Sequence, residues 1–198
     1  MASPTLRQIT GMTPNPSAIS DSALVLIDCQ QTYREGVMQL TGVEPALKEA
    51  ADLLARFRAA GRPVIHIMHE AGAGTPYDTS APIGQIADVV APQAGEVVIT
   101  KNYPSSFEKT DLKQELDKLG IKNLILTGFM THVCVNSTAR AAFNLGYANT
   151  VVANATATRT LANPTGGEIP ADVLHNASLT ALSDIFAVVV PSGKDIPN

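Results

Sequence analysis

Six short runs of apolar residues recur along the chain, at residues 23–27, 64–68, 97–99, 124–126, 151–153 and 186–190. They are rich in β-branched side chains and show no regular alternation of apolar and polar residues. Strands buried on both faces of a parallel sheet have this pattern, whereas strands with one face in water alternate. The runs therefore predict five or six strands of a parallel sheet.

Four further segments carry apolar residues at three- and four-residue steps, the spacing of one face of a helix. Their apolar positions are Leu47, Ala50, Leu54 and Phe57; Leu112, Leu116 and Leu119; Ala139, Ala142, Phe143 and Leu145; and Val173, Leu174, Ala177 and Leu182. Gly61, Gly120 and Gly146 end the first three segments, Thr110 opens the second, and Pro170 opens the fourth. The sequence thus predicts helices between or after the strands.

Alternating strands and helices indicate an α/β fold, because right-handed crossovers place the helices on the faces of the sheet. We predict a three-layer, doubly wound fold with a mostly parallel six-stranded sheet and helices on both faces. Residues 1–17 are rich in Thr, Pro and Ser and are predicted to form an N-terminal arm, with residues 18–198 as a single domain. Residues 71–95 are long for a plain connection and form a candidate wall or lid of an active site.

Composition narrows the class of protein. Of the 198 residues, 45% are hydrophobic and 16% charged, which suits one sizeable core and excludes a disordered or fibrous chain. The formal net charge is −4 without a basic cluster, so binding to a phosphate backbone lacks its driving force. No apolar run approaches the roughly 18 residues that span a bilayer, and the first 17 residues lack the apolar core of a signal peptide. We expect no nucleic-acid or membrane partner.

The two cysteines, Cys29 and Cys134, are too few for a disulfide scaffold, and a reducing, cytoplasmic location is therefore predicted.

Three chemically useful residues follow predicted strands, at the edge of the sheet where ligands bind in open parallel sheets. Asp28 follows the first run and Lys101 the third, while Cys134 ends the segment that leads from the fourth run into a helix. A helix N-terminus and a nearby lysine both lower the pKa of a thiol, so we expect a thiolate near neutral pH. Asp28 is the expected acceptor of the thiol proton.

Each of these residues also has an ordinary structural use. A strand-end aspartate often caps a turn, a strand-end lysine is usually solvated, and a lone cysteine is usually a small buried hydrophobe. Their joint placement at three strand ends is what favours a function. Cys29 has no helix N-terminus aimed at it and is predicted to pack in the core.

The sequence around these residues is specific. It reads LIDCQQTY at 26–33, KNYPSSF at 101–107, and TGFMTHVCV at 127–135 followed by STAR at 137–140. In order and spacing these segments resemble the strand-end aspartate, the lysine loop and the nucleophile segment of the isochorismatase-like cysteine hydrolase superfamily. That superfamily includes nicotinamidases and N-carbamoylsarcosine amidases, and the resemblance runs from about residue 23 to 190.

The resemblance implies that Cys134 attacks a substrate carbonyl, that Asp28 is the general base, and that Lys101 balances the charge between them. It also implies a cis peptide bond between Phe129 and Met130, and an oxyanion hole formed by the backbone N–H groups of Met130 and Cys134. Hydrolysis of a C–N bond in a small amide-like substrate, through a thioester acyl-enzyme, is the predicted reaction. The alternative is cleavage of an enol ether, as in isochorismatases, which lack a cysteine at the nucleophile position.

No metal or other cofactor is expected. Nicotinamidases typically carry an Asp-x-His metal motif after the second strand, whereas this chain reads VIHIMHEAG at 64–72. His66 and His69 are three positions apart, so on a strand they point to opposite faces and cannot share an ion. His69 lies nearer the end of the strand and is a candidate for the lining of the substrate pocket.

Four further residues lie close in sequence to the candidate catalytic positions and are predicted to line the pocket: Tyr33, Tyr103, Phe107 and His132. For Phe107 the alternative to pocket lining is packing in the core. For the two tyrosines it is a position on the surface or at an interface. His175 and Arg140 are placed on helices, where a solvated face or a bond between helices is the simpler use.

Three other functions are weaker alternatives. Cys134 and Arg140 have the Cys-x5-Arg spacing of tyrosine phosphatases, but that loop usually needs glycine and residues 135–139 contain none. No glycine-rich nucleotide motif follows any predicted strand, and a scaffold without catalysis would not need all three candidate residues. The expected partners are a small-molecule substrate and further copies of the chain, as a homo-oligomer (dimer or higher).

Overall fold

The six apolar runs form the strands of one sheet in the computed structural model, which describes residues 2–198. These strands are β1 (Ser22–Ile27), β2 (Val64–His69), β3 (Val97–Lys101), β4 (Asn123–Phe129), β5 (Ala148–Ala157) and β8 (Val188–Val190). They pair in the order β3-β2-β1-β4-β5-β8, and every neighbouring pair is parallel. The predicted α/β fold with a six-stranded sheet is confirmed.

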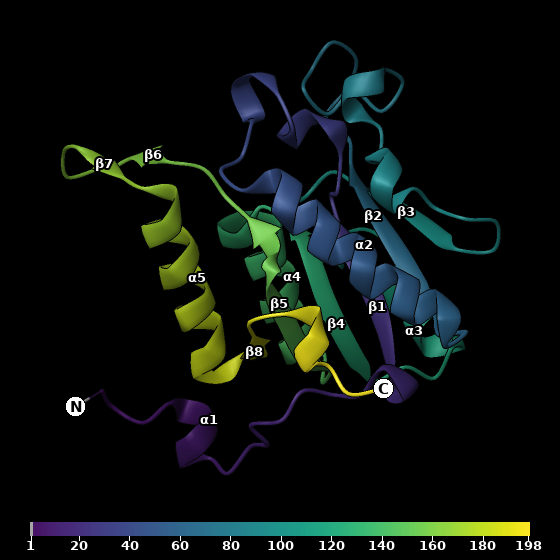
Figure 1. Cartoon of the computed structure of the whole chain (residues 1–198), viewed down its shortest axis with the longest axis vertical. Coiled ribbons are helices and arrows are strands. Elements are labelled where there is room, and N and C mark those ends of the chain that lie inside the picture. The colour runs from purple at the N-terminus through teal and green to yellow at the C-terminus, as the bar shows by residue number, and fades with distance from the viewer. Residues whose placement is uncertain (1) are drawn as a thin grey trace.

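Helices cover both faces of this sheet. The α-helices are α1 (Leu6–Ile9), α2 (Val43–Ala59), α3 (Leu112–Lys118), α4 (Asn136–Asn144) and α5 (Ala171–Ile185). In Figure 1, α2 crosses in front of the sheet, while α3 and α4 lie behind it. A short antiparallel hairpin of β6 (Leu161–Ala162) and β7 (Glu168–Ile169) precedes α5.

The core is divided in two by the sheet. Every residue of β1 is buried, and its side chains alternate between two apolar clusters. Leu24 and Leu26 belong to the cluster that contains Phe57 of α2, whereas Val25 and Ile27 belong to the cluster formed with α3, α4 and α5. Burial on both sides is the reason why the strand sequence does not alternate.

The helix ends follow the predicted signals with one exception. Gly61 has φ of +61° just after α2, and Pro170 is the residue that precedes α5. Thr110 was predicted to open α3, and the helix instead follows Asp111, one residue later, although the Leu112 amide at its start donates to Thr110 Oγ1 at 3.4 Å. The same hydroxyl donates a hydrogen bond to the Ser106 carbonyl oxygen at 2.5 Å, so it also closes the preceding turn.

The N-terminal arm and residues 71–95 are the two long irregular segments, and they lie at opposite ends of the strands (Figure 1). The N-terminal segment reaches α5, where the Leu6 amide donates to Asp184 Oδ1 and Arg7 Nη1 to the Ile185 carbonyl oxygen. Residues 71–95 pass beside the loop that follows β1, and the Ala87 amide donates to the Cys29 carbonyl oxygen at 2.8 Å. This contact places the segment at the carboxyl end of β1, next to Asp28, and its opening as a lid stays a prediction.

No helix among residues 2–198 is both long enough and apolar enough to cross a bilayer.

Candidate active site

Asp28, Lys101 and Cys134 meet at the carboxyl ends of β1, β3 and β4. Lys101 Nζ lies 2.7 Å from Asp28 Oδ2 and donates a hydrogen bond to Cys134 Sγ at 3.4 Å. Asp28 and Lys101 are fully buried, and Cys134 is 5% exposed. Three segments distant in sequence thus bring a carboxylate, an ammonium group and a thiol into contact, with the thiol nearest the surface.

Asp28 and Lys101 stand where strands end, and Cys134 stands where a helix begins. Asp28 has φ of +49°, a left-handed conformation that aspartate tolerates better than most residues, and it turns the chain out of β1. Lys101 is the last residue of β3. Cys134 lies in a π-helical turn (Thr131–Val135) that joins β4 to α4, so it stands at the start of a helix as predicted.

Gly128 in β4 allows this close approach. It has φ of +105°, and a Cβ atom there would lie 2.0 Å from the Ile27 carbonyl oxygen. Only glycine fits against the backbone at the end of β1 in this conformation. The β4–β5 register shifts beside it, between Leu126 and Gly128. Gly128 therefore sets the distance between the strand that ends in Asp28 and the strand that leads to Cys134.

Burial controls the protonation of the site. Burial raises the pKa of Asp28, against the opposing effect of the Lys101 charge. Burial, with a further contribution from the Asp28 carboxylate, raises the pKa of Cys134 to about 12. The expected thiolate near neutral pH is therefore wrong for the resting site: loss of solvent and a neighbouring negative charge outweigh Lys101 and the helix terminus. Asp28 Oδ2 lies 2.7 Å from Lys101 Nζ, whereas Oδ1 has no hydrogen-bond donor among the described residues and can still accept a proton.

An aromatic wall stands beside the three residues. Tyr33 is buried, its ring meets Phe129 edge to face at 5.6 Å, and its hydroxyl lies 3.2 Å from that of Tyr77. Tyr77 also meets the ring of His69 at 4.8 Å, and His69 Nδ1 lies 3.0 Å from Lys101 Nζ. Tyr77 comes from the segment 71–95 and was not predicted, because its sequence context has no pattern that ties it to a strand end.

The other predicted pocket residues lie in different surroundings. Tyr103 is 41% exposed and accepts a hydrogen bond from Lys109 Nζ at 3.0 Å. Phe107 stacks on Tyr147 with ring centroids 5.6 Å apart, on the side of the sheet that faces α3 and α4. His132 Nδ1 lies 2.6 Å from Thr158 Oγ1. Contact of these residues with a substrate stays a prediction.

The peptide bond between Phe129 and Met130 is cis, as the resemblance implied. The Met130 carbonyl oxygen accepts hydrogen bonds from the Val133 and Val135 amides at 3.0 and 3.3 Å, which anchors the π-helical turn. The oxyanion-hole role of the Met130 and Cys134 amides stays a prediction.

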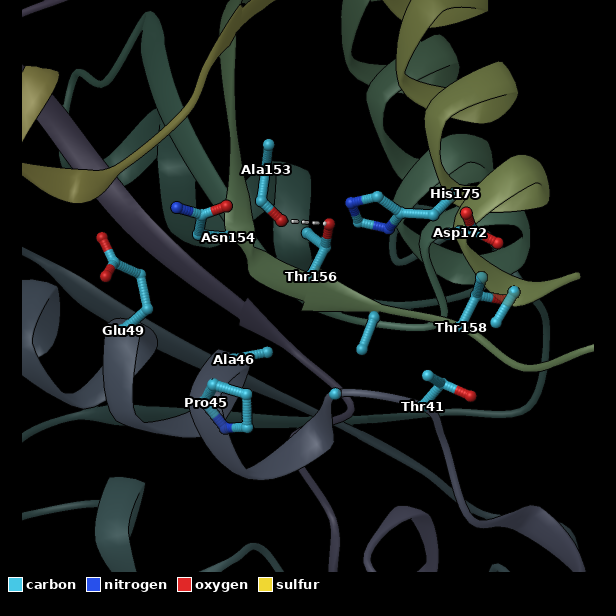
Figure 2. Close-up of a pocket in the computed structure, with 13 residues that line it drawn as sticks. Thr41, Pro45, Ala46, Glu49, Ala153, Asn154, Thr156, Thr158, Asp172 and His175 are labelled. Carbon is cyan, nitrogen blue, oxygen red and sulfur yellow. Dashed lines mark hydrogen bonds between the residues drawn. The ribbon is translucent and has the colours of Figure 1, made fainter.

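A cavity of about 380 Å³ lies between the first turns of α2 and α5, beside the end of β5 (Figure 2). Its lining includes Thr158 and His175, and does not include Asp28, Lys101 or Cys134. His175 Nδ1 lies 3.0 Å from the hydroxyl of Thr131, the first residue of the turn. The cavity therefore abuts the support of Cys134 rather than the thiol itself.

Among residues 2–198, no three His, Cys, Asp or Glu side chains are grouped so that they could hold a metal ion. His66 and His69 have separate partners: His66 Nε2 lies 2.9 Å from Glu96 Oε2, and His69 contacts Lys101.

Comparisons of the sequence and of the structure with known proteins point to the same family. The sequence model described as "Isochorismatase domain" matches residues 22–193. A secreted isochorismatase effector of Verticillium dahliae is 36% identical over 96% of this chain and 97% of its own. A ureidoacrylate amidohydrolase of Stutzerimonas stutzeri is 32% identical over 72% and 73% of the two chains. The crystal structure of an isochorismatase from Pseudomonas putida superposes with a TM-score of 0.94 at 37% identity, covering 98% of this chain and 100% of that one.

Proposed function

The chain belongs to the isochorismatase family of hydrolases, and we propose that it is a cysteine hydrolase that cleaves a C–N bond of a small amide-like substrate. The observation that carries this proposal is the contact of Lys101 with both Asp28 and Cys134 in a buried site. Cysteine is a nucleophile suited to acyl transfer, and a carboxylate beside it can take its proton.

In the first half of the reaction, Cys134 Sγ attacks the substrate carbonyl carbon while its proton moves to Asp28. The high pKa of the resting thiol fits this order, because the thiolate then forms only as the S–C bond forms. The carbonyl oxygen becomes an oxyanion, which the amides of Met130 and Cys134 are proposed to stabilise. The C–N bond breaks, the leaving nitrogen takes the proton from Asp28, and a thioester remains.

In the second half, a water molecule attacks the thioester carbonyl and gives a proton to Asp28. The C–S bond breaks, the carboxylic acid product leaves, and the sulfur regains its proton from Asp28. Lys101 stays in contact with both partners, so its ammonium group balances the negative charge whether it resides on oxygen or on sulfur.

We further propose that the substrate carries a carboxylate, which Arg159 receives. Arg159 follows β5 at the rim of the site, and its Nε is buried without a hydrogen-bond partner among the described residues. The residue before it, Thr158, has its hydroxyl 2.6 Å from Nδ1 of His132 in the turn that holds Cys134, and Arg159 Nη1 donates to the Val37 carbonyl oxygen at 3.4 Å. The amidohydrolase relative is named for an acrylate, which is a carboxylate.

Arg159→Met is expected to raise KM for such a substrate at least about tenfold with little change in kcat, and an unchanged KM contradicts this assignment.

The decisive test is a panel of small amides, carbamoyl compounds and hydroxamates, assayed for release of ammonia or amine. Cys134→Ala is expected to lower turnover on the order of 10⁴-fold or more while far-UV circular dichroism and melting temperature are preserved. Cys29→Ala is the matched control and should keep turnover, because Cys29 is also buried but packs in an apolar cluster, where its thiol hydrogen-bonds only to the Ile27 carbonyl oxygen. Turnover that survives in Cys134→Ala would overturn the proposal.

The same panel includes isochorismate, because a relative is named as an isochorismatase. Cleavage of its enol ether without dependence on Cys134 would assign the alternative reaction. Inhibition by vanadate would point to the Cys-x5-Arg phosphatase alternative, and inactivity on every compound together with no labelling of Cys134 by a thiol-reactive acyl probe would favour a scaffold. A small-molecule substrate, a homo-oligomeric assembly and a cytoplasmic location belong to the proposal, although one relative is named as secreted.

A further inference from the structure

Lys101 has a third neighbour besides Asp28 and Cys134. Its Nζ lies 3.0 Å from Nδ1 of His69, so the ammonium group contacts a carboxylate oxygen, a sulfur and an imidazole nitrogen. A lysine ammonium group has three N–H donors and no acceptor. Three contacts therefore use its full donor capacity, which matters because Lys101 is fully buried and an N–H group left without a partner there is costly.

The contact fixes the state of His69. An imidazole nitrogen that faces an ammonium group must be the acceptor, so the ring proton resides on Nε2. Burial and the charge of Lys101 lower the pKa of His69 to about 4, with Glu70 opposing them, so the ring is neutral in the neutral pH range. Tyr77, packed on the ring, has a raised pKa and is neutral as well.

Hydrogen bonds from the Gln30 side chain also fix the backbone of His69. Gln30 is buried, accepts the His69 amide through Oε1 at 2.9 Å, and donates through Nε2 to the His69 carbonyl oxygen at 2.9 Å. The β2–β3 register pairs His69 directly with Lys101. The Glu70 amide then donates to the Lys101 carbonyl oxygen at 2.9 Å, which locks the two strand ends together.

We propose that His69 is a positioning residue of the cysteine hydrolase site: its Nδ1 holds the Lys101 ammonium group on Asp28 and Cys134. The inference rests on the proposed function for its consequence, since a held ammonium group is what stabilises the sulfur as it gains negative charge. Without the acceptor, one buried N–H of Lys101 loses its partner and the ammonium group moves toward water. The sulfur then loses stabilisation, and nucleophilicity falls.

Two substitutions separate positioning from packing. His69→Phe keeps a ring against Tyr77 and removes the acceptor. His69→Asn removes the ring and keeps an acceptor, because Oδ1 of asparagine occupies the place of Nδ1 of histidine. If His69 acts through its nitrogen, the asparagine variant retains function and the phenylalanine variant loses it. If His69 acts as packing, the order is reversed.

The test is the rate at which iodoacetamide alkylates Cys134 between pH 7 and 9, followed by mass spectrometry of the Cys134 peptide with the Cys29 peptide as internal control. This readout needs no substrate, so it distinguishes failure of the inference from failure of the proposed function. We expect a rate about tenfold lower for His69→Phe, and within about threefold of the unmodified chain for His69→Asn. A smaller reagent, methyl methanethiosulfonate, should show the same ratio, since a steric block by phenylalanine would slow the larger reagent more.

Where a substrate is found, kcat should fall about 10- to 100-fold in His69→Phe with KM little changed, and His69→Asn should restore it. Equal rates in all three proteins, a slower asparagine variant than phenylalanine variant, or a reagent-dependent ratio would each overturn the proposal. If His69→Phe does not fold, His69→Leu supplies the acceptor-free comparison, judged by the same ratios.

Discussion

Asp28 influences the sulfur of Cys134 in two opposite ways. In the resting site its negative charge adds to burial in raising the pKa of Cys134, which disfavours the thiolate. During attack the same carboxylate is the proposed acceptor of the thiol proton, which makes the thiolate possible. The residue that suppresses free thiolate is therefore the residue proposed to generate it at the moment of attack.

Asp28→Asn separates these two effects. Asparagine tolerates the φ of +49° at this position, so the backbone is kept. Removing the carboxylate removes a cause of the raised pKa of Cys134 and leaves Lys101 to pair with sulfur, so alkylation of Cys134 near pH 8 should accelerate at least about tenfold. Turnover should fall on the order of 10³-fold or more, because no base remains.

The test measures the rate of Cys134 alkylation by iodoacetamide and the rate of turnover in the same preparation of Asp28→Asn. Far-UV circular dichroism verifies that the variant is folded. Loss of one partner of a buried ion pair will also lower the melting temperature. Slower alkylation in Asp28→Asn would contradict this account of the site's electrostatics.

The sequence was a good guide to which residues meet and a poor guide to their charge states. Strand-end positions of Asp28, Lys101 and Cys134 could be predicted, because parallel strands place their carboxyl ends together. The state of the thiol could not, because it depends on how completely water is excluded, and no local pattern reports this. Tyr77 was missed for a related reason: a residue in an irregular segment finds its neighbours only through the folded chain.

Among the regular elements, β4 depends most on a single residue. Gly128→Ala puts a Cβ atom against the Ile27 backbone in a conformation that alanine rarely adopts. We expect a loss of at least about 2 kcal/mol in the free energy of unfolding, measured by urea denaturation, and a loss of turnover because Asp28 and Cys134 are pushed apart.

Gly120→Ala is the control for this substitution. Gly120 has φ of +65° after α3, and a Cβ atom there has nothing within 4 Å. Its substitution measures the backbone term alone and should cost about 1 kcal/mol without affecting turnover. Equal losses for the two variants would show that the contact with Ile27 is unimportant.

Helix α2 is tied to the edge of the sheet by a charged cluster. Arg58 on α2 contacts Glu96 Oε1 at 2.7 Å, and His66 on β2 contacts Glu96 Oε2 at 2.9 Å. The hydrogen bond from Arg58 leads the causes that lower the pKa of Glu96 to about 2, and burial lowers the pKa of His66. The folded protein therefore favours ionised Glu96 and neutral His66.

Both shifts make the protein less stable in acid. A depressed carboxyl pKa stabilises the fold above the unfolded value of about 4.5, and this stabilisation is lost as the pH falls toward 2. Neutral His66 contributes in the same sense, with the loss beginning as the pH falls below about 6.5. Glu96→Gln should lower the free energy of unfolding by about 1–3 kcal/mol at pH 7, with the difference from the unmodified chain shrinking between pH 4.5 and 3.

Urea unfolding at a series of pH values measures this difference. Asp52→Asn, which breaks an exposed pair with Lys48 on the same helix, should change stability by less than about 0.5 kcal/mol at every pH. A Glu96→Gln difference that does not depend on pH would contradict the assigned cause.

The elements themselves were largely predictable, and the failures have local causes. Each apolar run became a strand, because continuous burial leaves a continuous apolar sequence. The β6–β7 hairpin was not predicted, since two residues per strand carry no period. The start of α3 was misplaced by one residue: the Thr110 hydroxyl donates backward to the Ser106 carbonyl oxygen and also accepts from the Leu112 amide, while the helix follows Asp111. A short polar side chain can hydrogen-bond to the backbone on either side, so a threonine near a helix start does not fix the first helical residue.

At the scale of the whole molecule, the sheet couples the two halves of the core. Leu54 on α2 and Leu182 on α5 lie in different apolar clusters, yet both clusters are built on alternate residues of β1. Loosening either cluster exposes one face of the same strand and weakens the other. One cooperative unfolding unit is therefore expected, which is the physical content of the predicted single domain over residues 18–198.

The N-terminal arm should lie outside this unit. Helix α1 has no buried residue, and the segment is attached to α5 through polar contacts made by Leu6 and Arg7. Deleting residues 2–15 should lower the free energy of unfolding by only about 1–2 kcal/mol, whereas Leu54→Ala and Leu182→Ala should each lower it by about 2–5 kcal/mol. In every case the urea transitions followed by far-UV circular dichroism and by tyrosine fluorescence should coincide. Two separate transitions in either leucine variant would mean that the clusters unfold independently and that the sheet does not unite them.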